Sequence, residues 1–208
     1  MNLTVAIAIA IANQSGAPEH LAIATASYGC CENKKSPSIY TWRSIMEKYR
    51  NVLKKIEKMH AHSLSDKHGL TCKQIQYGDA AALYIAKKNW TNRFERDREK
   101  TIGIFYCVWV SPELLEDEKY AYNIHSLKLR ELPGYKLASR EFANNFRTAV
   151  QSRVASWPNI SMDYGPLTLL EGRDQCEIDT FDKKIEKRIS DFVEIHKEID
   201  KLLHVAAN

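Results

Sequence analysis

The sequence predicts an α+β domain in which a small, mainly antiparallel sheet is flanked by amphipathic helices. Its 208 residues are 44% hydrophobic and 27% charged, close to the globular average, which excludes disordered and collagen-like chains. Several long segments repeat apolar residues at intervals of three and four, a spacing typical of helices that bury one face. Short apolar runs cluster without a regular alternation of strand and helix, which favours α+β over α/β. We therefore expect a single domain over residues 1–208 that ends in a long helix over 179–204.

The amino-terminal run at residues 3–12 admits three interpretations. The strict alternation of Val or Ile with Ala favours a strand. The high helix propensity of Ala supports a helix instead, and the A-x-A-like ending at residues 10–12 is a feature of cleaved secretory signals. A secretory signal would have Lys or Arg before its apolar run, and none precedes this one. The run is also far shorter than the stretch of about twenty residues that spans a bilayer, so no membrane span is expected there.

The remaining elements follow from periodicity and from signals at their ends. Apolar residues at helical spacing predict helices over residues 37–60, 79–90, 139–154 and 179–204. Ser36 and Asp79 are placed to cap the first two. Apolar or alternating runs predict strands near residues 102–110, 120–130 and 162–170. The segment from His60 to Thr71, between the first two helices, is expected to be a loop.

The cysteines and glycines limit the compartment and the cofactors. Five cysteines without C-x-x-C spacing make neither a disulfide framework nor a paired set of zinc ligands, so a reducing, cytoplasmic location is expected. The glycines are too dispersed for either of the Gly-rich phosphate-binding loops, and no cofactor is expected.

The charge of the chain is unevenly distributed. The net charge is only +4, too small to indicate a nucleic-acid-binding protein by itself. Residues 34–100, however, contain sixteen Lys and Arg against seven Asp and Glu, a local net charge of +9, and the remainder of the chain carries −5. This asymmetry predicts a basic face for nucleic acid or another polyanion.

The predicted anion-binding residues come from two parts of this basic segment. Lysines and arginines neutralise phosphates, and an exposed aromatic ring stacks on unpaired bases. The alternative is that the aromatic residues pack in the core and that neighbouring carboxylates pair with the basic side chains. The predicted contacts are Arg43, Lys48, Lys54, Lys55, Lys58, Lys87, Lys88, Trp90 and Arg93.

A hydrolase, in particular a nuclease or phosphodiesterase, is one alternative function, and it would use either His125 or a metal held by His60, His62 and His68. His125 and Asn123 fall on the same face of the strand predicted over 120–130, and Glu131 follows it. A histidine near a carboxylate is a suitable general base. The alternative interpretation of His125 is a hydrogen-bonded structural residue on a half-buried strand.

Two further parts of the sequence are candidate sites. Imidazoles and a carboxylate suit zinc or iron, and His60, His62, Asp66 and His68 are close in sequence, but their spacing matches no established metal motif. We therefore predict no metal site and regard a solvated loop or helix end as the better interpretation of this segment. The helix over 179–204 has apolar positions at steps of four and three. This spacing suits a second alternative function, a protein–protein interaction module or homodimer formed through this helix, and it equally suits packing of the helix within its own domain.

Overall fold

A five-stranded antiparallel sheet forms the centre of the structure, a computed structural model that describes residues 39–95, 100–134 and 138–207. The order of the strands in the sheet is their order in the chain, and each strand pairs antiparallel with the next. The strands are β1 (Leu70–Tyr77), β2 (Ala80–Lys87), β3 (Gly103–Val110), β4 (Lys119–Leu127) and β5 (Thr168–Gln175). The predicted α+β class is therefore confirmed.

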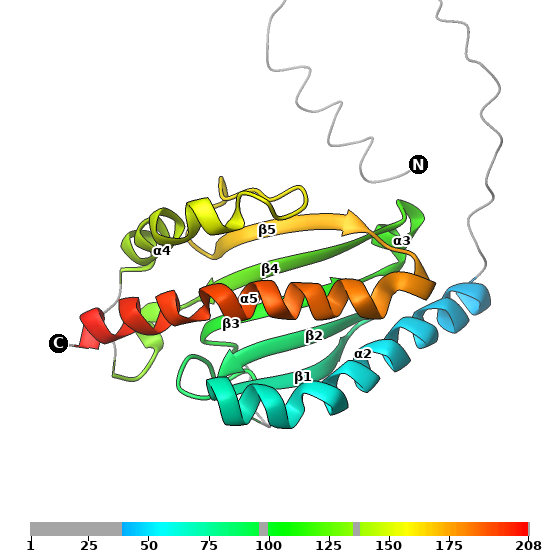
Figure 1. Ribbon diagram of the computed structural model, residues 1–208, viewed down its shortest axis with the longest axis horizontal. Helices are drawn as coiled ribbons and strands as arrows, with labels where there is room; N and C mark the ends of the chain where they lie inside the picture. The colour runs from blue at the N-terminus through cyan, green and yellow to red at the C-terminus, as the bar shows by residue number, and fades with distance from the viewer. Residues whose placement is uncertain (1–38, 96–99, 135–137, 208) are drawn as a thin grey trace, which may run out of the picture. The chain divides into compact units, whose positions relative to one another are not determined.

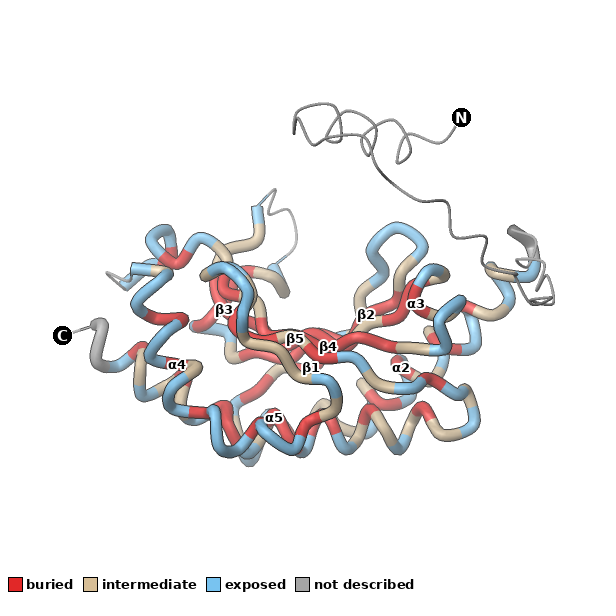
Figure 2. The backbone as a smooth tube through the Cα atoms, turned by 90° about the horizontal axis from the view of Figure 1, so that it is seen from above, coloured by how far each residue is buried: buried red, intermediate tan, exposed pale blue. Residues whose placement is uncertain are grey.

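Three helices cover one side of the sheet. They are α2 (Ile39–His68), α4 (Ser139–Val154) and α5 (Ile178–Ala207), and α5 lies between the other two (Figure 1). Figure 2 shows all three on the same side of the strands. The short helix α3 (Pro112–Glu116) and the 3₁₀ turn η1 (Leu129–Glu131) flank β4 along the chain. The sheet thus has a helix-covered face and a face that none of the described helices covers.

The core lies between the sheet and α5. Tyr106 of β3 stacks on Phe192 of α5, with ring centroids 4.7 Å apart and an interplanar angle of 6°. The apolar positions of α5 that suggested a dimer seam are all buried against this core: Ile185, Ile189, Phe192, His196, Ile199 and Leu203. The seam spacing therefore serves packing within the chain, and a homodimer through this helix stays a prediction.

Two segments of the first half differ from the sequence prediction. The predicted loop after His60 is helical as far as His68 and then enters β1. The helix predicted over 79–90 is instead strand β2, and Asp79 belongs to a two-residue hairpin turn that begins at Gly78, whose φ is +56°. A glycine at the first turn position suits a tight β-hairpin. Because β2 is buried on both faces, its apolar run lacks the alternation that identifies a half-buried strand, and strand pairing overrides the helix propensity of its alanines.

The last strand is shifted along the chain. A strand near 162–170 was predicted, whereas β5 begins at Thr168. Before this strand, Ser161 forms a single β-bridge with Glu171 of β5, and Arg147 holds the loop that follows. The Arg147 guanidinium donates hydrogen bonds to the backbone carbonyls of Tyr164, Gly165, Thr168 and Leu169.

The other predicted elements are confirmed to within a few residues. Strands near 102–110 and 120–130 correspond to β3 and β4, and helices over 139–154 and 179–204 correspond to α4 and α5. All described residues belong to the unit Ser36–Asn208. The run at residues 3–12 lies outside the described residues, so its assignment and the single domain over 1–208 stay predictions.

Candidate anion-binding surface

Five of the nine residues predicted to contact an anion lie on the outer face of α2. Arg43, Lys48, Lys54, Lys55 and Lys58 are all exposed. At about 100° per residue they fall within an arc of about 140° around the helix. None of the five forms an ion pair with another described residue. We call these five residues the α2 basic face.

The apolar pattern of α2 determines this orientation. Met46, Tyr49, Leu53 and Ile56 are buried against the sheet and α5, so the cationic positions between them point outward. Arg50 is the exception, because its side chain is only 18% exposed. It pairs with Glu47 at 3.4 Å and donates to the Asp79 carbonyl, so it links α2 to the β1–β2 hairpin.

Two residues predicted to contact an anion, Trp90 and Lys87, instead contact Asp200 of α5. Trp90 has 0% of its surface exposed, and its indole Nε1 donates to Oδ1 of Asp200 at 3.0 Å. The other carboxylate oxygen of Asp200 pairs with the Lys87 ammonium. In this conformation Trp90 has no free ring face on which a base could stack, which favours the core interpretation. Its sequence neighbours could not show this, because Asp200 lies more than a hundred residues away.

Lys88 and Arg93, the other two predicted contacts after β2, lie in different surroundings. Lys88 is exposed beside a pocket described below, whereas the Arg93 guanidinium lies 4.8 Å from the ring centroid of Tyr84. Arg93 also donates to the Tyr84 hydroxyl at 3.3 Å and to Thr101 at 3.0 Å. The contacts and pocket linings of Lys87, Lys88 and Arg93 therefore differ from one another, and none includes a residue of the α2 basic face.

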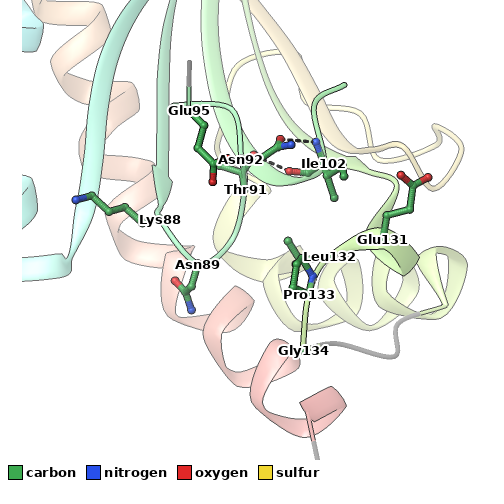
Figure 3. Close-up of a pocket in the computed structure, with 10 residues that line it drawn as sticks. All are labelled: Lys88, Asn89, Thr91, Asn92, Glu95, Ile102, Glu131, Leu132, Pro133 and Gly134. Carbon is green, nitrogen blue, oxygen red and sulfur yellow. Dashed lines mark hydrogen bonds between the residues drawn. The ribbon is translucent and has the colours of Figure 1, made fainter. Parts of the chain in front are cut away.

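A pocket of about 390 Å³ lies between the β2–β3 connection and η1 (Figure 3). Asn92 shapes its wall, because its side chain accepts from Ile102 N at 2.7 Å and donates to Lys100 O at 2.9 Å. The charged groups are Lys88, Glu95 and Glu131, so the pocket mixes a cation with two carboxylates. Its lining residues are Lys88, Asn89, Thr91, Asn92, Glu95, Ile102, Glu131, Leu132, Pro133 and Gly134.

The predicted catalytic pair lies elsewhere, on the face of the sheet without helices. Tyr106 points to α5, so its strand neighbour Phe105 points to the opposite face. His125 is the register partner of Phe105, and their rings lie 5.2 Å apart. Burial, together with nearby Arg93, lowers the pKa of His125 below its ordinary value, and the Leu167 carbonyl partly opposes this.

Asn123 shares that face with His125, as the sequence predicted. It is only 4% exposed, and its Oδ1 has no hydrogen-bond partner among the described residues. Glu131 does not join them, because it lies in η1 beside the pocket of Figure 3. The carboxylate nearest in register is Glu171, which pairs with Arg173 at 3.5 Å. The three predicted catalytic residues are therefore not assembled.

The four candidate metal ligands lie on the last turns of α2 rather than in a loop. His62 and Asp66 are exposed, whereas His60 and His68 are half-buried. No group of three or more His, Cys, Asp or Glu side chains within the described ranges is arranged to hold a metal ion. The ring of His68 instead contacts His196 of α5, with centroids 5.3 Å apart.

Sequence reasoning missed a basic pocket where α2, β2 and α5 meet. We call it the junction pocket; its volume is about 380 Å³, and it is lined by Lys67, His68, Lys87, His196, Lys197, Asp200 and Lys201. These residues are spread over more than a hundred positions in the chain. No local motif could therefore have identified the pocket.

Comparison with known proteins adds no further constraint. No protein-family model, curated protein or solved structure matches this chain. Within the described residues, none of the helices has the length and apolar character that a bilayer crossing requires.

Proposed function

We propose that this protein binds nucleic acid through the phosphates that contact the α2 basic face. The observation that supports the proposal is the set of five exposed cations on one side of α2, none of them paired with another described residue. When unpaired, solvated lysines and arginines neutralise phosphates, the nucleic acid releases counterions that were condensed on it. This release is the main source of non-specific affinity.

The arrangement suits contact with the backbone rather than recognition of bases. From Arg43 to Lys58 the face is about 22 Å long at 1.5 Å per residue, which spans about six phosphates of one strand. Phosphate contacts position a protein on nucleic acid without reading its sequence. Since Trp90 is buried, the proposed binding involves no base stacking on that ring.

The test is fluorescence anisotropy with labelled single- and double-stranded oligonucleotides over about 50 to 200 mM salt. Five phosphate contacts predict a slope of log K against log salt of about −4.5 on duplex DNA. The double variant Lys54→Glu/Lys58→Glu removes two contacts, so the slope should fall to about −2.7, with a loss of affinity of about tenfold or more at low salt.

The matched control reverses two exposed cations on other helices, Arg140→Glu in α4 and Lys183→Glu in α5. It changes the net charge of the protein by the same amount. Its affinity should therefore fall much less than that of the α2 variant. Absence of binding at low salt, or an equal loss in the control, contradicts the proposal. Binding to heparin without binding to any oligonucleotide would assign the face to another polyanion.

A further inference from the structure

The junction pocket carries an excess of positive charge. Lys67 and His68 come from the end of α2, Lys87 from the end of β2, and the rest from α5. Four lysines face one carboxylate, that of Asp200. The pocket therefore gathers four lysines from three elements around a single lining carboxylate.

Both oxygens of the one carboxylate already accept a hydrogen bond. Asp200 accepts from Lys87 through one oxygen and from the Trp90 indole through the other. Lys201 pairs with Glu198 at 2.9 Å. Lys67 and Lys197 are both exposed and form no ion pair with a described residue, so two ammonium groups at this pocket are free to bind an anion.

Two histidines complete the wall. His196 is 2% exposed, and its Nδ1 lies 2.7 Å from the Val193 carbonyl. A carbonyl can only accept, so Nδ1 carries the proton and Nε2 is the nitrogen that titrates. Burial, with Lys87 and His68 nearby, lowers the pKa of His196, while the Val193 carbonyl and Asp200 oppose that change.

We infer that the junction pocket binds a single tetrahedral oxyanion, namely phosphate, either free or as a terminal phosphate group. Lysine ammonium groups bind phosphate as point charges. The volume of about 380 Å³ exceeds that of one phosphate and leaves room for part of the group that carries it. The site for free phosphate does not depend on the proposed function, whereas a terminal phosphate on an oligonucleotide does.

Binding should strengthen as the pH falls. Besides His68 and the Trp90 ring, the charged groups that share the pocket with His196 are Lys87 from β2, Lys67 from α2, and Lys197, Asp200 and Lys201 from α5. An anion in the pocket offsets the repulsion from the lysines and favours protonation of the imidazole. Sulfate is the probe for this effect, because it keeps two charges throughout the neutral range.

The experiment is an NMR titration of the full chain with inorganic phosphate and with sulfate. The variant Lys67→Gln/Lys197→Gln should weaken phosphate binding about tenfold. Both positions are exposed, so the fold should be retained, and the amide spectrum checks this. The control Lys54→Gln/Lys58→Gln should bind phosphate within about twofold of wild type while losing nucleic-acid affinity.

Two oligonucleotides that differ only in a terminal phosphate or hydroxyl distinguish the two candidate ligands, free phosphate and a terminal phosphate group. Tighter binding of the phosphorylated one, abolished by Lys67→Gln/Lys197→Gln, assigns the pocket to a chain end. Equal affinities together with phosphate binding assign it to the free anion. If neither phosphate nor sulfate perturbs the pocket, or if the Lys67→Gln/Lys197→Gln variant binds like wild type, the inference is wrong. That result would not contradict the proposed binding of nucleic acid by the α2 basic face.

Discussion

Replacing Trp90 with Phe distinguishes a buried structural residue from a ligand contact. The indole is fully buried beside Phe192 and His196, with ring centroids 6.4 and 6.5 Å away. Its Nε1 proton is donated to Asp200, and the Lys87 ammonium lies 5.5 Å from the ring centroid. The substitution keeps an aromatic ring but removes the donor, leaving Asp200 with Lys87 as its remaining partner.

The loss can be estimated from these contacts. A hydrogen bond to a charged group contributes about 1.5–3 kcal/mol, and the smaller ring adds a partial cavity. The free energy of unfolding should therefore fall by about 2–4 kcal/mol. For a domain of this size each kcal/mol corresponds to about 2–4 °C, so Tm should fall by about 5–15 °C.

Urea unfolding and nucleic-acid anisotropy on the same sample measure the two roles separately. The affinity of Trp90→Phe should stay within about twofold of wild type, because the α2 basic face is unchanged. Trp109→Phe is the control: this ring is half-buried and has no indole hydrogen bond to a described residue, so a smaller loss of stability is expected. Unchanged stability together with weaker nucleic-acid binding in Trp90→Phe would refute the reasoning.

Three other predictions follow. A methyl group at Gly172 would overlap the Tyr122 ring, so Gly172→Ala should lower the free energy of unfolding by about 2–3 kcal/mol in urea titrations, and a neutral result would contradict that packing. Burial raises the pKa of the Cys107 thiol to about 12, so mass spectrometry should find it unmodified by iodoacetamide in the folded protein and alkylated in denaturant. Because the pKa values of His125 and His196 are lowered in the folded state, the unfolded chain binds more protons below about pH 6.5. Stability should therefore fall from pH 7.5 to 5.5, by at most about 1.4 kcal/mol per histidine per pH unit, and a rise would reverse the argument.

Local sequence patterns located the three long helices and the α2 basic face. In α2 the spacing of Met46, Tyr49 and Leu53 defines the buried side, and the five cations occupy the other side by helical geometry alone. The same reasoning located α4, α5 and the strands β3 and β4, because each has its own period or an unbroken apolar run.

Only the tertiary structure decided that β2 is a strand and which residues the side chains at its end and just after it contact. The alanines of β2 favour a helix locally, but pairing with β1 and β3 and burial on both faces make the segment a strand. That strand then directs Lys87 toward Asp200, buries Trp90 and places Arg93 over Tyr84, so a continuous basic stretch of sequence is divided among separate places. The junction pocket arises in the same way, since packing of distant segments rather than any local period brought its lysines and histidines together.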